Sequence, residues 1–443
     1  MDMQLQLLRL LPLLFLFVSW PLFLRDTNRS PLRDAAGLHP IVLLPGHSCS
    51  QLRARLTDEY EPAAAAPNCG ARKGKGWFRL WENHTALQDP ALVPCYAEQL
   101  RLVYDPVARD YRDAEGVDVR VMSFGTTRGF GSDNRPASKN NCMRRLVNAL
   151  ERVGYRDGKN LFGAPYDFRY APAPPGQPAL RFSRSVSSLR RLIERASERN
   201  GDKPVILVGH SHGSFNALEF LNQNTLRWRR RHVKHFVMVS YGAGGSVPPL
   251  KLLASSSAIG IGRPPQPGDD LLSPAGNTGR SFASALSTLP SPGVFGHAPL
   301  VITRAKNYSA HDMPEFLAAA GFSDDEVTRY RTRMMSVLLS FRAPIVPTTC
   351  INAVGVPTAE KLVYWDDDDF GAAEPEVVYG DGDGAINKAS FLAWDTVIGG
   401  DPDQEYYKSI FIRNTTHAGV IKDDFALQRV VREILEANSA SHH

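Results

Sequence analysis

A single serine stands between two glycines in the stretch Gly209-His210-Ser211-His212-Gly213. The residues before it, Val205 to Val208, are all apolar and predict a buried strand, and the apolar positions after it recur at helical spacing. Glycines on either side permit the sharp strand-to-helix turn that lifts a serine hydroxyl clear of a sheet at a helix N-terminus. A surface loop rich in glycine would share the five residues but not the strand and helix around them. We therefore predict that Ser211 is a nucleophile.

A serine hydroxyl needs a base to remove its proton and a carboxylate to hold that base in the right tautomer. Asp383 and His417 each follow a predicted strand, and the order serine, acid, histidine is that of α/β-hydrolases. Asp381 competes for the acid role, but we favour Asp383 because Gly384-Ala385-Ile386 follows it directly. The sequence thus predicts a triad of Ser211, Asp383 and His417.

Two histidines, His210 and His212, flank the serine itself. They are poor candidates for the base, because side chains next to the nucleophile at such a turn point away from it. A second buried strand, Ile41 to Leu44, ends in Pro45-Gly46-His47-Ser48. Hydrolases place an oxyanion-hole loop at this point, where backbone N–H groups face developing negative charge. An ordinary turn after a strand has the same appearance, and the residues alone leave both interpretations open.

The elements that must position these residues alternate between strand and helix. Apolar runs predict further strands at 235–240, 345–353 and 409–412, and one-sided apolar spacing predicts helices at 142–153, 186–196 and 427–435. This alternation indicates the α/β class, with a mostly parallel sheet covered on both faces. Residues 242–300 break the rhythm and are rich in Gly, Ser and Pro, so this long segment is either disordered or functional, and in a lipid enzyme it would form a lid.

The composition excludes some classes of function. The chain has 443 residues, 43% of them apolar, which is enough for a large core. Its 51 basic and 46 acidic residues leave a formal charge of +5, and no basic tract is interleaved with aromatics, so no nucleic-acid partner is expected. None of the five cysteines has C-x-x-C spacing, and we expect neither a metal site nor a cofactor.

The N-terminal residues predict entry into the secretory pathway. The stretch Leu10 to Leu24 is apolar except for Ser19, a length typical of a signal-peptide core and short for a membrane span. No small-x-small cleavage site follows, so an uncleaved signal anchor stays open as an alternative. Residues 25–38 are polar and have the character of a linker. We expect a secreted protein or one in the lumen of the endoplasmic reticulum or vacuole.

Sequons and cysteines agree with an oxidising, lumenal environment. N-x-S/T sequons begin at four asparagines: Asn28, Asn83, Asn307 and Asn414. The first is a poor acceptor because Pro31 follows its sequon. An odd number of cysteines leaves at least one thiol free, and the pair closest to a plausible local loop is Cys69 with Cys95.

Residues 60–95 contain no long periodic segment, but they hold three large aromatics in Gly76-Trp77-Phe78-Arg79-Leu80-Trp81. These side chains, Trp77, Phe78 and Trp81, suit either a packed core or a surface that faces lipid, since tryptophan favours membrane interfaces. The residues alone leave both interpretations open.

Over residues from about His39 to Ile434 the sequence resembles the lecithin–cholesterol acyltransferase-like lipases, of the plant phospholipid:sterol acyltransferase and lysosomal phospholipase A2 types. Six blocks carry the resemblance, together with His417: residues 41–46, 76–81, Gly163-Ala164-Pro165-Tyr166-Asp167-Phe168-Arg169, Gly209 to Gly213, Asn307-Tyr308-Ser309 and Tyr379 to Asn387. The block at 163–169 and the run Gly380-Asp381-Gly382-Asp383-Gly384 are long and specific.

The resemblance implies an α/β-hydrolase core over residues 39–443, with a membrane-binding insertion at about 60–96 and a cap at about 242–340, of which 246–290 would be the lid. With that insertion in view, we predict that Trp77, Phe78 and Trp81 contact lipid. It implies the triad named above and backbone N–H groups of His47 and His212 as the oxyanion hole. It also implies a Cys69–Cys95 disulfide in the insertion, and we expect Cys142 and Cys350 to be reduced.

The implied reaction takes an acyl chain from a phospholipid onto the serine and passes it to an alcohol such as a sterol, or to water. A phospholipase A would use the same acyl-enzyme, and a lipid-binding protein with little activity is a third alternative. Three departures from the family pattern bear on this choice: His212 after the nucleophile, His47-Ser48-Cys49-Ser50 in the first loop, and Tyr241-Gly242-Ala243-Gly244-Gly245 in place of the P-W-G-G block.

Overall fold

The computed structural model describes residues 37–62, 67–83, 85–86, 89, 91–130, 142–254, 276–365 and 374–440. The expected signal segment at 1–24, most of the expected linker, Asn28 and the centre of the expected lid lie outside these residues.

Six strands form the central sheet, in the order β15-β12-β9-β8-β1-β7, and every neighbouring pair is parallel. Their bounds are β1 Ile41–Leu44, β7 Leu161–Gly163, β8 Val205–His210, β9 Val233–Val239, β12 Thr348–Val354 and β15 Tyr407–Arg413. Because all neighbours are parallel, the carboxyl ends of the strands meet at one edge, where α/β enzymes place their ligands. The fold is an α/β-hydrolase core.

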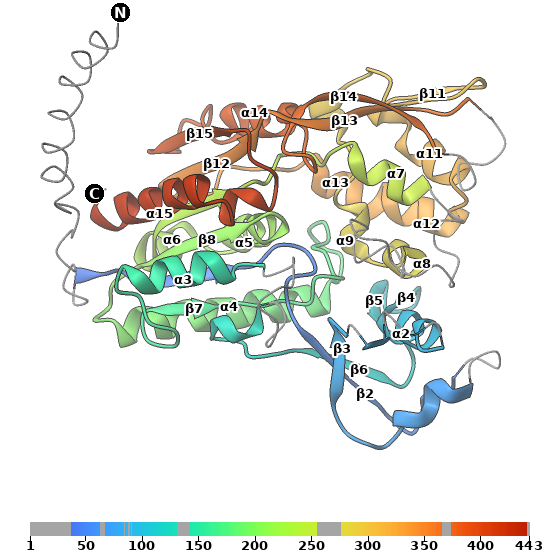
Figure 1. The fold of residues 1–443 in the computed structure, drawn as a ribbon, viewed down its shortest axis with the longest axis horizontal. Helices are drawn as coiled ribbons and strands as arrows, with labels where there is room; N and C mark the ends of the chain where they lie inside the picture. Colours follow the sequence, from blue (N-terminus) through green and yellow to red (C-terminus); the bar gives the residue numbers. More distant parts are fainter. Residues whose placement is uncertain are drawn as a thin grey trace, which may run out of the picture.

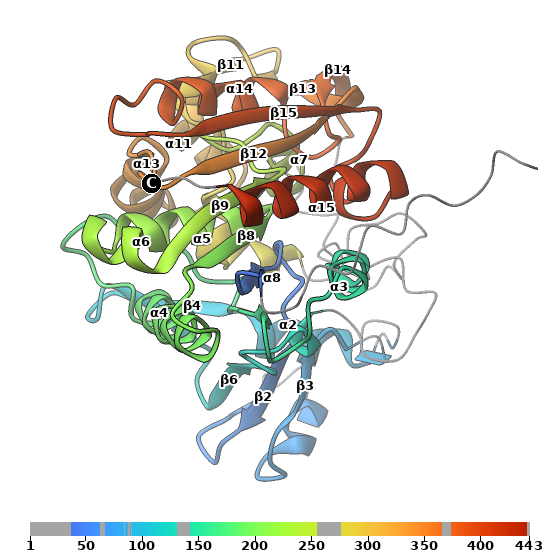
Figure 2. The same ribbon diagram turned by 90° about the vertical axis from the view of Figure 1, so that its left-hand side faces the viewer.

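Helices cover both faces of this sheet (Figures 1 and 2). One face carries α3 (Arg144–Arg152) and α15 (Asp424–Ser439), and the other carries α4 (Leu180–Arg199), α5 (His212–Asn222), α6 (Leu226–His232) and α14 (Lys388–Val397). Alternate residues of one strand point to opposite faces. Ile41 and Leu43 accordingly join the cluster under α3 and α15, whereas Val42 and Leu44 join the cluster on the other side.

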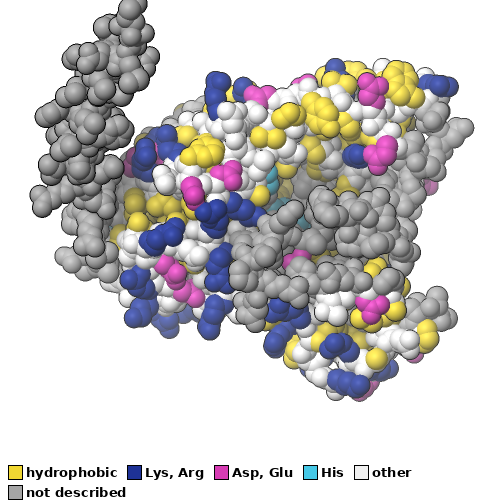
Figure 3. Space-filling model, viewed as in Figure 1, with side chains coloured by type: hydrophobic (Ala, Val, Ile, Leu, Met, Phe, Trp, Pro, Cys, Tyr) yellow, Lys and Arg dark blue, Asp and Glu magenta, His cyan; other side chains and the backbone are white. Residues whose placement is uncertain are grey.

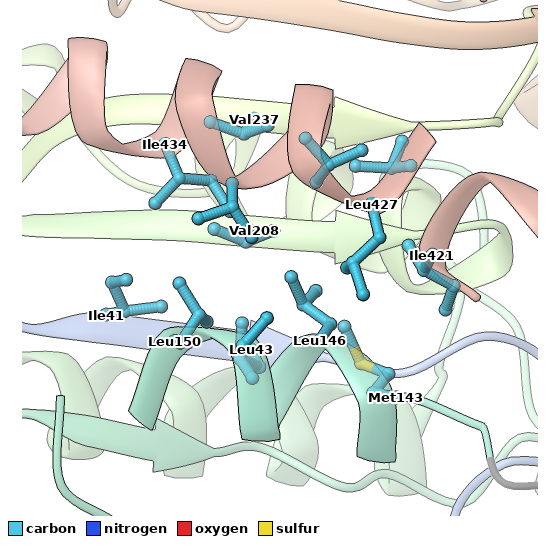
Figure 4. Packing of buried hydrophobic residues seen from close by; sticks show 14 of the residues in the cluster. Ile41, Leu43, Met143, Leu146, Leu150, Val208, Val237, Ile421, Leu427 and Ile434 are labelled. Carbon is cyan, nitrogen blue, oxygen red and sulfur yellow. The ribbon is translucent and has the colours of Figure 1, made fainter. Parts of the chain in front are cut away.

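Figure 4 shows the first of these clusters, in which Leu146 and Leu150 of α3 and Leu427 and Ile434 of α15 converge on the sheet. All four are almost or completely buried. Fully burying a side chain of this size contributes about 1.5–3 kcal/mol. Apolar packing on both faces therefore fixes the sheet whose edge carries the site.

A smaller module projects from the core beside this sheet (Figure 1). Its antiparallel sheet has the order β3-β2-β6, built from β2 (Leu52–Leu56), β3 (Phe78–Trp81) and β6 (Val117–Val121). The rest is η2 (Pro67–Arg72), α2 (Val93–Leu100) and the hairpin β4 (Leu102–Asp105) and β5 (Asp110–Asp113). The insertion expected at about 60–96 thus shares its sheet with strands on both sides of that range.

A second group of elements, here called the cap, consists of the short helices between β9 and β12 and a sheet of order β11-β10-β13-β14, so it extends beyond the expected range of about 242–340. Its helices are α7 (Pro248–Ala254), α8 (Gly276–Arg280), α9 (Ala283–Leu286), α10 (Pro292–Phe295), η5 (Ala310–Asp312), α11 (Met313–Ala319), α12 (Asp324–Arg329), the π-helical turn η6 (Tyr330–Met334) and α13 (Met335–Leu338). Its strands are β10 (Val301–Ile302), β11 (Asn307–Tyr308), β13 (Val356–Val363) and β14 (Glu376–Gly382). Short turns η3 (Thr127–Gly129) and η7 (Gly419–Ile421) complete the described elements.

Two disulfides are present, and one of them corrects the sequence-based expectation. Cys69 on η2 is bonded to Cys95 on α2. Cys142, expected to be reduced, is bonded to Cys49, which ties the loop after β1 to the start of α3. Cys350 is a free, buried thiol.

None of the described helices has the length and apolar character needed to span a bilayer.

Candidate active site

Ser211 occupies the turn between β8 and α5, with a backbone φ of 54° and ψ of −133°. A positive φ is uncommon outside glycine and often marks a strained functional position. The two flanking positions have no room for a side chain. A Cβ atom on Gly209 would lie 2.5 Å from Cα of Ser214, and one on Gly213 would lie 2.4 Å from the carbonyl oxygen of Leu44. Strand and helix can therefore approach closely enough to present the hydroxyl at the edge of the sheet.

The structure brings the three residues of the predicted triad together. Nε2 of His417 lies 2.8 Å from Oγ of Ser211, and Nδ1 of the same ring lies 2.7 Å from Oδ2 of Asp383. The other carboxylate oxygen, Oδ1, accepts from the N–H groups of Ala385 and Ile386 at 3.0 and 2.7 Å. The residues that follow Asp383 thus orient its carboxylate toward the imidazole.

His417 is placed to take a proton. Burial alone would lower the pKa of His417, but the charge and hydrogen bond of Asp383 outweigh it and hold this pKa above its usual value. A base with a raised pKa accepts a proton more readily, and a serine next to it is deprotonated as it attacks. The hydrogen-bonded series Ser211–His417–Asp383 has the geometry needed for nucleophilic catalysis through an acyl-serine.

Asp381, the competing acid, is held elsewhere. Its carboxylate accepts from Nζ of Lys388 at 2.9 Å and from the N–H of Gly355 at 2.8 Å, at an exposed position. No contact between Asp381 and His417 is present in the described structure, so it is not the acid partner of the imidazole.

The loop after β1 passes close to the serine. A Cβ atom on Gly46 would lie 3.2 Å from Cβ of Ser211, and the carbonyl of Pro45 is held by the hydroxyl of Tyr166 at 2.9 Å. Within the described residues, the backbone N–H groups of His47 and His212 donate no hydrogen bond. Unpaired N–H groups beside a serine nucleophile are the donors that an oxyanion needs.

Comparison with known proteins shows the family of this chain. The family model for lecithin:cholesterol acyltransferase matches residues 77–290. "Lecithin-cholesterol acyltransferase-like 1" of Oryza sativa subsp. japonica is 44% identical over 409 residues, covering 91% of this chain and 88% of that protein. This chain belongs to the lecithin:cholesterol acyltransferase family.

The chain is also similar to an animal protein. "Lysosomal phospholipase A and acyltransferase" of Canis lupus familiaris is 32% identical over 397 residues, with 87% of this chain and 88% of that protein covered. Among solved structures, a chain of the Tle4–Tli4 complex has a TM-score of 0.51 at 14% identity and covers 91% of this chain and 99% of itself. At that identity the likeness concerns the fold alone.

His210, next to the serine, is turned toward the backbone. Its Nε2 lies 3.0 Å from the carbonyl oxygen of His417, and burial, reinforced by the neighbouring imidazole of His417, lowers the pKa of His210 to about 3. His210 therefore supports the loop that carries the base without reaching the hydroxyl of Ser211.

The block that replaces the family's P-W-G-G motif packs against α14. The ring of Tyr241 stacks on Phe215 with centroids 5.6 Å apart, and its carbonyl accepts from the indole N–H of Trp394 at 2.6 Å. A Cβ atom on Gly242 would lie 2.3 Å from Cβ of Ser390. In this chain the rings of Tyr241 and Trp394 thus pack together beside Phe215.

Sequence reasoning missed a buried arginine that joins the insertion to the core. Arg169 is completely buried, and its guanidinium pairs with Asp113 of β5 and Asp167, both at 2.6 Å. It also donates to the carbonyl of Leu100 at the end of α2, at 3.0 Å. The signal was the arginine that ends the specific block at 163–169, but its partner Asp113 lies too far along the chain to be recognised.

Trp81 does not face lipid. It is 2% exposed, its indole N–H donates to the carbonyl of Ser48 at 2.5 Å, and its ring lies against Phe168 and Tyr96. The prediction of lipid contact is wrong for this residue, because β3 pairs Trp81 with Leu52 and so turns the indole toward the loop after β1.

Trp77 and Phe78 are partly exposed, and Phe78 also packs against the core of the insertion. The guanidinium of Arg120 lies 3.9 Å from the ring centroid of Trp77, that of Arg55 lies 5.2 Å from it, and Arg72 lies 5.0 Å from the centroid of Phe78. These distances are those of cation–π contacts.

Proposed function

We propose that this protein moves a fatty acyl chain from a phospholipid to an alcohol acceptor such as a sterol through an acyl-enzyme on Ser211. The observation that carries the proposal is the hydrogen-bonded series Ser211–His417–Asp383 in a chain of the lecithin:cholesterol acyltransferase family. The rice relative is named "Lecithin-cholesterol acyltransferase-like 1", and that likeness favours a sterol acceptor.

The first half of the reaction forms the acyl-enzyme. Nε2 of His417 takes the proton of Ser211 as Oγ attacks the ester carbonyl of the phospholipid, and Asp383 stabilises the imidazolium. The carbonyl oxygen becomes an oxyanion facing the N–H groups of His47 and His212. The ester C–O bond then breaks, and the departing lysophospholipid oxygen takes the proton from His417.

The second half regenerates the serine. An acceptor hydroxyl gives its proton to His417 and attacks the acyl carbonyl, and a second oxyanion occupies the same hole. When the bond between the acyl carbon and Oγ breaks, Oγ of Ser211 recovers the proton from His417. The product is a new ester.

Hydrolysis is the alternative, with water in place of the alcohol. The canine relative, at 32% identity, is named for phospholipase A activity as well as acyltransferase activity. The first part of that name is the observation that favours hydrolysis as a second function. Both reactions share the acyl-enzyme, so the residues around Ser211 do not separate them.

We propose that the insertion contacts the lipid surface that holds the substrate. Figure 3 supports this, since hydrophobic and basic side chains are interspersed over the insertion at the lower right. Trp77 and Phe78 supply the aromatic contact, and the arginines stacked on them supply positive charge for lipid phosphates.

The two disulfides fit a protein of the secretory pathway. We propose a secreted or lumenal location, with glycans at Asn307 and Asn414, both of which are exposed. Asn83 is a poorer acceptor than the sequence alone predicts, because its amide donates to the carbonyl of Arg79 and accepts from the N–H of Ala86.

Incubation of the pure protein with acyl-labelled phosphatidylcholine, with and without sterol, tests the proposal. Label in sterol ester supports acyl transfer, and label in free fatty acid under both conditions supports the phospholipase. If all label stays in phosphatidylcholine while the protein binds the vesicles, the protein is a lipid-binding protein and both enzymatic proposals fail.

A further inference from the structure

Two imidazoles join the proposed oxyanion hole to the cap. Nε2 of His47, on the loop after β1, lies 3.2 Å from Oγ of Ser284 in α9. Nε2 of His212, the residue after the nucleophile, lies 3.5 Å from Oγ of Ser287 at the end of the same helix. The hydroxyl of Ser287 in turn donates to the carbonyl of Ser284 at 2.6 Å. The residues that would supply both oxyanion donors thus touch one short cap helix.

The tautomer of His212 follows from its other contact. Nδ2 of Asn216 donates to the carbonyl of His212 at 3.0 Å and also to Nδ1 of its ring at 3.1 Å. Nδ1 must then carry no proton, which leaves Nε2–H to donate toward Ser287. The 3.5 Å contact is at the long end for a hydrogen bond, so the His47–Ser284 contact carries most of the link.

The imidazoles of His47 and His212 are buried among aromatic rings, which restricts the interactions that they can make. The ring of His47 meets Phe168 edge-on with centroids 5.0 Å apart, and Tyr166 stacks on His212 at 6.2 Å. Burial lowers the pKa of His47 to about 4, and burial together with His47 lowers the pKa of His212 to about 3. Both rings are neutral near neutral pH and offer hydrogen bonds rather than charge.

We propose that His47 and His212 are positioning residues, whose imidazoles fix the two backbone N–H donors of the oxyanion hole against the cap serines Ser284 and Ser287. The inference rests on the proposed function and extends it to the cap. An oxyanion hole acts only when its donors stand at a set distance from the developing charge. The position of α9 against the two imidazoles then affects the rate of the chemical step. A displacement of α9 would therefore lower kcat more than it would change KM.

Ser284→Ala tests this link, because it deletes one hydroxyl and leaves the imidazole and both N–H groups in place. With a soluble short-chain ester, we expect kcat to fall about 5- to 30-fold, the range for loss of one or two kilocalories of interaction, with KM within two-fold. The affinity of a trifluoromethyl ketone, whose serine adduct places an oxyanion in the hole, should fall by the same factor. A merely structural role would not move this affinity in step with kcat.

Three further variants sharpen the test. His47→Phe should lower kcat at least as much as Ser284→Ala, His47→Gln should retain part of the activity, and the double variant His47→Phe/Ser284→Ala should be no slower than His47→Phe. Ser291→Ala is the matched control, because Ser291 is a buried cap serine whose hydroxyl donates to the carbonyl of Leu338 and accepts from the N–H of Gly293, and among the described residues it has no hydrogen bond to His47 or His212. Its kcat and ketone affinity should match those of the unmodified protein.

Unchanged kcat and ketone affinity in Ser284→Ala, equal losses in Ser291→Ala, or additive losses in the double variant would overturn the inference. If Ser284→Ala does not fold, Ser287→Ala carries the same prediction with a smaller effect. Failure of the proposed function gives a different result, since the ketone would then not react at Ser211 even in the unmodified protein.

Discussion

Asp383 and His417 are joined by two hydrogen bonds. The carboxylate Oδ2 lies 2.7 Å from Nδ1 of the imidazole, and the carbonyl of Asp383 accepts the backbone N–H of His417 at 2.8 Å. The side chain of Asp383 is completely buried, so water does not compete for its oxygens. The loop after β14 and the loop after β15 are thereby locked together, and the imidazole has one orientation toward Ser211.

Asp383→Asn should therefore impair the chemistry strongly. We expect kcat to fall on the order of 10⁴-fold, because an amide at this position favours the wrong tautomer of the histidine. Asp381→Asn is the matched control, since Asp381 lies two residues away, near the end of β14, and pairs with Lys388 on the surface. Comparable losses in the two variants, measured with a soluble ester, would refute the assignment of Asp383.

The pH dependence of kcat/KM should report His417. The base works only when neutral, so activity is lost as the pH falls through the pKa of His417. Because Asp383 raises this pKa above its ordinary value of about 6.5, the acidic limb should lie above that pH. A limb below pH 6 in the unmodified protein, measured with a soluble substrate, would contradict the account.

Cys49 and Cys142 should be bonded in the purified protein, and peptide mapping without reduction checks this. Cys142→Ser should lower the free energy of unfolding by about 2–5 kcal/mol, because the bridge closes a loop across 93 positions. Burial raises the pKa of Cys350 to about 12, so this thiol should not react with iodoacetamide until the protein unfolds. Rapid alkylation of Cys350 in the native protein, or a reduced Cys142, would show the assignment to be wrong.

Trp77 and Trp81 form a matched pair for the membrane proposal. Trp81→Ala should destabilise the protein by about 3–5 kcal/mol and impair soluble and vesicle substrates together, because this indole packs in the core. Trp77→Ala should weaken binding to phospholipid vesicles while hydrolysis of a soluble ester and the unfolding temperature stay nearly unchanged. If Trp77→Ala leaves vesicle binding intact, the insertion meets lipid elsewhere or not at all.

Much of the site could be predicted because each of its residues sits directly after an element with a strong local signal. Val205 to Val208 are wholly buried, as an uninterrupted apolar run requires. Ser211 and His417 come after β8 and β15 of the central sheet, whereas Asp383 comes after β14 of the second sheet. The predicted helix at 142–153 begins at Arg144 and ends at Arg152 in the structure. Local patterns of this kind fix the element and its face.

Long-range contacts could not be predicted in the same way. Whether Cys142 finds Cys49 depends on how α3 packs beside the loop after β1, and no local pattern encodes that packing. In β3, Leu80 and Trp81 are both buried although neighbouring strand residues point to opposite faces, because each face of the strand is covered. The alternation of strand residues between two faces therefore could not show from the sequence that Trp81 is buried and not exposed.

The central claim is that the acyl chain passes through Ser211, and capture of the acyl-enzyme tests it most directly. The protein is mixed with acyl-labelled phosphatidylcholine, quenched in acid within the first turnover and digested, and the labelled peptide is sequenced. We predict label on the peptide that contains Ser211, and none in a Ser211→Ala variant that shows the same unfolding temperature. Label on another peptide, or label that persists in Ser211→Ala, would contradict the account.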